Sequence, residues 1–163
     1  MSKSWVRGEA SVANVEDWRA NVIDHEQGVA EAIDTCRRIA VLGIKTEAQR
    51  GQPAIEVPRY MAGEGYEIIP VPVYYPDVEE ILGQPVYRRV SEVPGGVDMV
   101  NVFRRSADVP PHVDDIVAAA PRYVWMQTGI SNDQAAERLA RAGIKVIQDR
   151  CLMVEHARRS RRR

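Results

Sequence analysis

Residues 38–65 read RIAVLGIKTEAQRGQPAIEVPRYMAGEG. The run 38–43 is almost wholly apolar and ends in glycine, which is typical of a strand buried on both faces of a parallel sheet. A polar loop follows, and Pro53 stands where the first turn of a helix would begin. The start of a helix exposes unpaired backbone N–H groups and a partial positive charge, to which Lys45 and Arg50 add two cations. We therefore expect this strand, loop and helix to bind a phosphate-bearing ligand.

The composition indicates one globular domain. The 163 residues suffice for a single domain and are too few for two ordinary ones. Hydrophobic residues make up 45% and charged residues 28%, and no apolar run approaches the roughly 20 residues that span a bilayer. The first residues lack the apolar core and cleavage site of a secretion signal, so we expect a cytoplasmic protein without a membrane partner. Cys36 and Cys151 fit neither a disulfide framework nor a zinc site and are expected to be free thiols.

Basic residues are concentrated at the end of the chain. Five of the last six residues are arginine, and without them 17 basic residues stand against 23 acidic ones, a balance of about −6 against −1 for the whole chain. An acidic body does not suggest a nucleic-acid partner. We predict that residues 158–163 form a disordered, solubilising basic tail, and weak binding of this tail to anionic surfaces is the less favoured alternative.

Strand and helix patterns alternate along the rest of the chain. After the opening strand, further strands are predicted at 66–73, 97–103, 122–127 and 144–149, and helices at 53–62, 77–82, 108–120 and 132–143. This alternation requires right-handed crossovers, so the fold class is α/β: a Rossmann-like, doubly wound parallel sheet of about five strands in three α/β/α layers. Pro58 lies inside the first of these helices and indicates either a later helix start or a kink.

Helical patterns at 15–22 and 26–37 precede the sheet, and we expect them to cover the sheet or its edge. On this basis the chain divides into an N-terminal helical extension (1–25), a Rossmann-like domain (26–157) and the basic tail (158–163).

Ligands of such sheets bind beyond the carboxyl ends of the strands, near the point where the strand order reverses. This rule gathers the segments 43–50, 71–74, 102–105, 127–129 and 149–151. Together they are apolar and basic, which suits a ligand with phosphates, an aromatic base and an apolar arm. A nicotinamide dinucleotide is less favoured, because residues 70–74 contain no acid for a ribose hydroxyl and no G-x-G-x-x-G follows the first strand.

Several separate segments resemble the small stand-alone CoA-binding domain proteins, which are related to the nucleotide-binding domain of the succinyl-CoA ligase α subunit. The similarity spans residues 32–156 and rests on IAVLG, VPRYM before GYEIIPV, EEILG, VDMVNVFRR, VWMQTGI and DRCLMVEH. It implies coenzyme A as the ligand. Ligase activity is not implied, because the phosphorylated histidine of the ligase lies in a further domain. The loop also departs from its relatives, since Gly51 and Gln52 separate Arg50 from Pro53.

The resemblance implies a role for each strand end. The loop after the first strand would take the diphosphate through Gly43, Ile44, Lys45, Thr46 and Arg50. The ends of the second and third strands would hold adenosine through Val71, Pro72, Val73, Val102, Phe103 and Arg104. The end of the fourth strand would face the pantetheine arm through Met126, Gln127 and Gly129.

Three functions stay open at this point. The first is a module that binds coenzyme A or acyl-CoA without catalysis, and the second is an NAD(P)- or other nucleotide-dependent enzyme. The third is a regulatory protein whose contact with a partner changes with coenzyme A occupancy or with a mixed disulfide at Cys151. We favour the first, because no acid or base is evident in the cleft. For 149–151 the preferred interpretation is an Asp–Arg pair beside a buried, inert thiol. His25, His112 and His156 do not have metal-ligand spacing. A homodimer or another protein as partner stays open.

Overall fold

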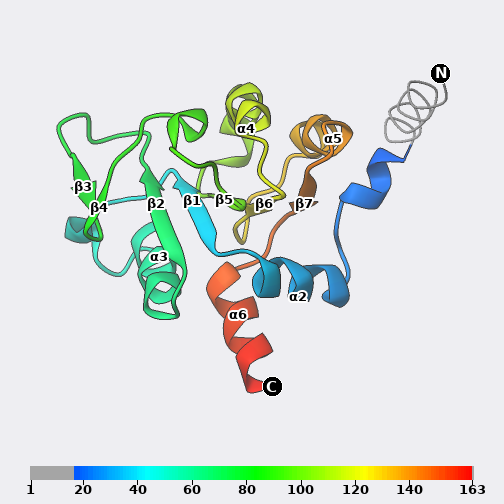
Figure 1. The fold of residues 1–163 in the computed structure, drawn as a ribbon, viewed down its shortest axis with the longest axis horizontal. Coiled ribbons are helices and arrows are strands. Elements are labelled where there is room, and N and C mark those ends of the chain that lie inside the picture. Colours follow the sequence, from blue (N-terminus) through cyan, green and yellow to red (C-terminus); the bar gives the residue numbers. More distant parts are fainter. Residues whose placement is uncertain (1–16, 163) are drawn as a thin grey trace.

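The computed structural model describes residues 17–162. Its centre is a five-stranded parallel sheet with the strand order β2-β1-β5-β6-β7 (Figure 1). The strands are β1 (Arg38–Leu42), β2 (Glu67–Val71), β5 (Met99–Val102), β6 (Tyr123–Met126) and β7 (Lys145–Ile147). The predicted α/β, doubly wound class is confirmed. The strands β1 and β5 are neighbours. From β1 the chain continues to β2 at one edge, and from β5 it continues through β6 to β7 at the other edge, so the strand order reverses between β1 and β5.

Helices cover both faces of the sheet, which gives the three layers seen in Figure 1. Three helices pack on one face: α2 (Glu26–Thr35), α3 (Pro53–Gly63) and α6 (Leu152–Arg161). Two helices pack on the other: α4 (Val113–Ala119) and α5 (Asp133–Arg141). Side chains alternate between the faces along each strand. In β6, for example, Trp125 belongs to the first core and Val124 to the second.

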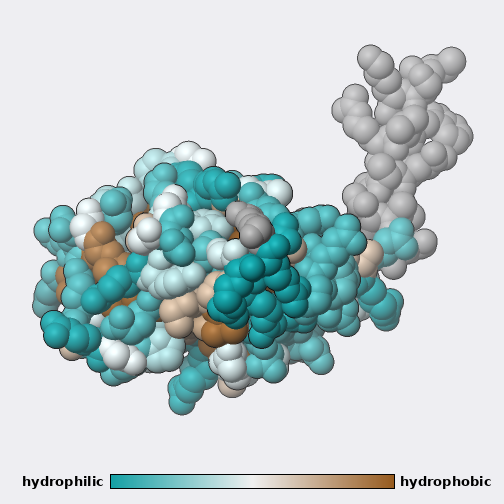
Figure 2. All heavy atoms as spheres, turned by 90° about the horizontal axis from the view of Figure 1, so that it is seen from below, coloured by the Kyte–Doolittle hydropathy of each residue, from teal (hydrophilic) through white to brown (hydrophobic). Residues whose placement is uncertain are grey.

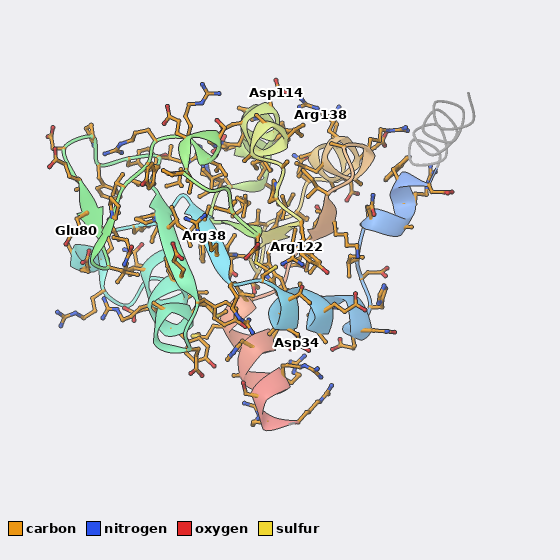
Figure 3. All side chains as sticks on the ribbon, in the orientation of Figure 1. Asp34, Arg38, Glu80, Asp114, Arg122 and Arg138 are labelled. Carbon is orange, nitrogen blue, oxygen red and sulfur yellow. The ribbon has the colours of Figure 1, made fainter. Side chains whose placement is uncertain are left out.

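Ion pairs connect the helices at the surface. Arg138 on α5 and Asp114 on α4, both labelled in Figure 3, form an ion pair at 2.7 Å. Arg159 on α6 lies 2.6 Å from Asp34 on α2. The second pair bears on the predicted basic tail. Arg158, Arg159 and Arg161 belong to the helix α6, so the prediction of a disordered tail is wrong for them. Arginine is a good helix former, and the pairing with Asp34 across 125 residues is not visible in the local sequence.

Figure 2 shows the molecule from below the view of Figure 1, the side toward which α6 projects, and the surface of this helix end is hydrophilic. None of the helices between residues 17 and 162 is long and apolar enough to cross a bilayer.

The segment 77–82 is not helical as predicted. It enters a hairpin of β3 (Glu80–Ile81) and β4 (Gln84–Pro85). The two residues between these strands, Leu82 and Gly83, both have positive φ angles, 52° and 75°. A two-residue turn of this kind matches the twist of a hairpin, and Gly83 favours it.

Prolines shorten the helix predicted at 108–120. The chain first makes two 3₁₀ turns, Ser106–Asp108 and Pro110–His112, and α4 begins only at Val113. Pro110 and Pro111 have no backbone N–H to donate, so α-helical hydrogen bonding cannot start before them.

The predicted N-terminal extension is described in part. Of the predicted helix 15–22, the first two residues lie outside the described range, and the rest contains a 3₁₀ turn, Trp18–Asn21. The chain then runs along the edge of the sheet, where Val22 bridges Val146 of β7 and Ile23 N–H donates to the Val146 carbonyl at 2.8 Å. This contact covers one open edge of the sheet, as expected for the segment.

Candidate functional site

The site begins where β1 ends beside β5. Gly43 follows β1 with φ +86°, and its N–H donates to the Val71 carbonyl at 2.9 Å. A Cβ atom on Gly43 would lie 2.2 Å from the Phe103 carbonyl oxygen, far inside van der Waals contact. Both the backbone angle and this close approach therefore require glycine. Gly43 brings the loop after β1 and the loop after β5 together at the edge where the strand order reverses.

A proline inside α3 connects that helix to the loop after β1. Pro58 has no N–H, so it cannot make the helical bond to the Ala54 carbonyl four residues earlier. The Ala54 carbonyl instead accepts a hydrogen bond from the Lys45 amide at 3.1 Å. The helix α3 starts at Pro53 even though Pro58 lies inside it. The Ala54 carbonyl, which Pro58 cannot engage, holds the backbone of Lys45 against the first turn of α3.

The rest of the loop is held by its own polar groups. Thr46 caps the 3₁₀ turn Glu47–Gln49: its hydroxyl accepts from the Ala48 amide at 3.3 Å, and its amide donates to Gln49 Oε1 at 2.9 Å. Arg50 is exposed at the far end of this turn. Hydrogen bonds within the loop therefore hold its backbone, and the Thr46 hydroxyl takes part in them.

A pocket of about 350 Å³ opens between the ends of β1, β5 and β6. It is lined by Lys45, Gln52, Pro53, Ala54, Phe103, Arg104, Arg105, Gly129 and Ile130. Four of these were predicted site residues: Lys45, Phe103, Arg104 and Gly129. The ionisable groups in the lining are one lysine and two arginines, and the beginning of α3 adds the positive end of a helix dipole. The pocket therefore suits an anion with an apolar portion.

Arg104 is the most firmly held of the three cations. Its side chain is 16% exposed, its Nε donates to His112 Nε2 at 3.3 Å, and its guanidinium lies 3.9 Å from an oxygen of Asp108. The ring of Tyr74, in the loop after β2, lies 5.7 Å from the guanidinium. Arg105 contrasts with it: this side chain is 87% exposed and pairs with Asp108 at 2.9 Å.

The loop that carries Tyr74 is held by Arg88. The guanidinium of Arg88 donates to the carbonyls of Tyr74, Tyr75 and Val78 at 2.8–3.1 Å, and also to that of Pro76. Tyr74 is 63% exposed, so its ring presents an aromatic surface to solvent next to Arg104.

The structure places the other predicted residues around the pocket rather than in its lining. Four have side chains buried in the core: Ile44, Val71, Val102 and Met126. Gln127 is also buried, and its Oε1 accepts from Asn101 Nδ2 at 3.1 Å and from the Leu152 amide at 3.0 Å. Pro72 is buried and Val73 is 37% exposed, both beyond β2. Gly43, Thr46 and Arg50 belong to the loop described above.

The segment Asp149, Arg150 and Cys151 fixes the loop after β6. Asp149 Oδ1 accepts from the Gly129 amide at 2.6 Å. Arg150 pairs with Glu26 at 3.3 Å and Glu155 at 3.7 Å, so the expected Asp–Arg pair gives way to these contacts. The thiol of Cys151 is partly exposed rather than buried. Asp149 thus holds the backbone of Gly129 at the wall of the pocket.

The three histidines have separate structural partners. His25 accepts from the Gly28 amide at 3.1 Å, and His156 lies 2.9 Å from the Tyr60 hydroxyl. His112 contacts Arg104. Burial first, and then the neighbouring Arg104, lower the pKa of His112 below its ordinary value. No group of three or more potential metal ligands occurs among residues 17–162.

The region around the pocket matches a known family. The sequence pattern of the CoA binding domain matches residues 37–157, which contain all three strand ends of the pocket. The chain belongs to the CoA-binding domain family. The resemblance seen in the sequence is therefore confirmed.

Three known proteins are similar to this chain over most of their own length and most of its length. The chain is 34% identical over 129 residues to the uncharacterized protein YneT of Bacillus subtilis, covering 79% of this chain and 92% of YneT. The structure of cell-free ID.343 from Thermus thermophilus is 33% identical, with a TM-score of 0.75 over 83% of this chain and 99% of that one. A hypothetical protein from Pyrococcus horikoshii is 27% identical, with a TM-score of 0.74 over 83% of this chain and 92% of that one.

A larger enzyme shares the fold. The dinucleotide-forming acetyl-coenzyme A synthetase 1 of Candidatus Korarchaeum cryptofilum matches with a TM-score of 0.59 and 21% identity, over 71% of this chain and 26% of the synthetase chain. At this identity the match bears on the fold alone.

Proposed function

We propose that the chain binds coenzyme A, free or as an acyl thioester, in the pocket between β1, β5 and β6, and catalyses no reaction of its own. The observation that carries the proposal is the convergence of Lys45, Arg104 and Arg105 with the first turn of α3 at the reversal of strand order. Membership of the CoA-binding domain family supports the choice of ligand.

The parts of the ligand suit different walls of the pocket. The diphosphate would lie against Lys45 and the start of α3, where cations and a helix dipole stabilise negative charge. The adenosine would lie toward Arg104 and Tyr74, and the pantetheine arm toward Phe103 and Ile130. The proposal of binding without catalysis rests on the lining, whose ionisable groups are all cations suited to holding phosphate.

Isothermal titration calorimetry with coenzyme A, NAD and ATP tests the ligand. Saturable binding of coenzyme A, tighter than that of NAD, is expected. Tight binding of NAD with no response to coenzyme A would refute the proposal and favour a nucleotide-dependent enzyme.

Two variants test the pocket. Lys45→Ala and Arg105→Ala are each expected to weaken coenzyme A binding about 3–10-fold, because each removes one phosphate contact near the surface. Arg59→Ala is the matched control, since Arg59 is an exposed arginine on α3 that does not line the pocket. Equal affinities of all three variants and the wild type would place the ligand elsewhere.

A further inference from the structure

Arg104 has a supporting contact outside the pocket. His112 does not line the pocket, yet its Nε2 lies 3.3 Å from Arg104 Nε, on the stem side of the guanidinium. When Nε donates to His112, the two terminal amino groups of the guanidinium face away from this contact; one of them, Nη2, lies 3.9 Å from Asp108 Oδ2, beyond hydrogen-bond distance. Arginine uses such paired N–H groups to bind phosphate oxygens.

The backbone holds His112 in a fixed position. His112 ends the 3₁₀ turn Pro110–His112, and its amide donates to the Val109 carbonyl at 3.0 Å. Val109 is fully buried, and the rings of Pro110 and Pro111 fix their φ angles. His112 is thus tied to the core through a short rigid turn.

The charge on the imidazole matters for this contact. Burial and Arg104 lower the pKa of His112, while Asp115 and Asp108 raise it less. The ring is therefore neutral at pH 7, and a neutral imidazole has one nitrogen that accepts a hydrogen bond. A protonated ring would have no acceptor for Arg104 Nε.

We propose that His112 is a positioning residue that orients Arg104 toward an anionic group of the bound ligand. The inference rests on the proposed binding of coenzyme A and adds a residue that does not touch the ligand. His112 acts through Arg104 alone, so its contribution to affinity disappears when the guanidinium is absent.

A double-mutant cycle measured by calorimetry with coenzyme A tests this coupling. His112→Ala is expected to weaken binding about 3–10-fold, which corresponds to the loss of one hydrogen bond. His112→Gln is expected to bind within about twofold of the wild type, because the glutamine amide oxygen replaces Nε2 as acceptor. In an Arg104→Met background, His112→Ala is expected to change the affinity less than about twofold. Thermal unfolding of each variant establishes that it is folded at the temperature of the titration.

The outcomes separate the two proposals. If the wild type binds coenzyme A and His112→Ala binds equally well, or loses as much affinity in the Arg104→Met background as alone, the positioning role is refuted and the proposed function stands. If His112→Gln binds as weakly as His112→Ala, the acceptor at Nε2 is not what matters and the inference fails. If the wild type does not bind coenzyme A, both proposals fall.

Discussion

Gly43→Ala is expected to destabilise the protein through both its backbone angle and one close contact. An alanine would have to adopt φ +86°, which costs about 1 kcal/mol. Its Cβ would also lie 2.2 Å from the Phe103 carbonyl oxygen, so the ends of β1 and β5 must separate. Forcing backbone apart in a packed core costs about 1–3 kcal/mol, which makes about 3 kcal/mol in total. For a chain of this size the melting temperature should fall by about 6–12 °C.

Gly51→Ala separates the two contributions. Gly51 lies in the same loop with φ +89°, but apart from its two chain neighbours no residue comes within 4 Å of the position of its Cβ. Only the backbone term of about 1 kcal/mol applies there. Urea denaturation of both variants should therefore give a difference of about 2 kcal/mol in the free energy of unfolding. Equal stability of the two variants would show that the ends of β1 and β5 do not approach as described, and the geometry of the pocket would fail with them.

Stability should fall in two stages as the pH is lowered. Burial and Arg104 lower the pKa of His112 below 6.5. The neutral ring therefore stabilises the fold above pH 6.5, and this contribution is lost as the pH falls through the folded pKa. The variant His112→Gln should lack this first stage. Burial raises the pKa of Asp98 and Asp115, but hydrogen bonds to both carboxylates outweigh burial and lower each pKa below 3.8. The second contribution is therefore present above pH 3.8 and is lost as the pH falls through the folded pKa values. Urea denaturation between about pH 8 and about pH 2 measures both stages, and a flat profile would contradict these assignments. The thiols should differ in reactivity: Cys36 is fully buried, and burial raises its pKa to about 11, whereas Cys151 is partly exposed. A disulfide reagent at pH 8 should modify one thiol of the native protein and two after denaturation, and a mass spectrum with the first adduct on Cys36 would refute the burial of that residue.

Local patterns are sufficient to predict the strands and the carboxyl edge. Each strand is a short apolar run, and the rule for parallel sheets then assigns Lys45, Phe103, Arg104 and Gly129 to the same edge. The structure gathers these four residues in one pocket. Both steps succeed because they depend on hydrophobic periodicity and chain order.

Contacts between distant segments are not predictable in this way. Ile44 follows the first strand like a loop residue, but it is buried in the core. The role of His112 depends on a side-chain contact with Arg104 across two 3₁₀ turns. Pro58 lacks an N–H, so the sequence alone indicates that the Ala54 carbonyl, four residues earlier, has no helical donor. That this acceptor meets the Lys45 amide is visible only in the folded chain.

A crystal structure of the chain grown with coenzyme A would locate the ligand itself. We expect density for the diphosphate within hydrogen-bond distance of Lys45 and the first turn of α3, with the adenine toward Tyr74. Coenzyme A bound at another surface, or a pocket without ligand at a saturating concentration, would contradict the proposed binding site.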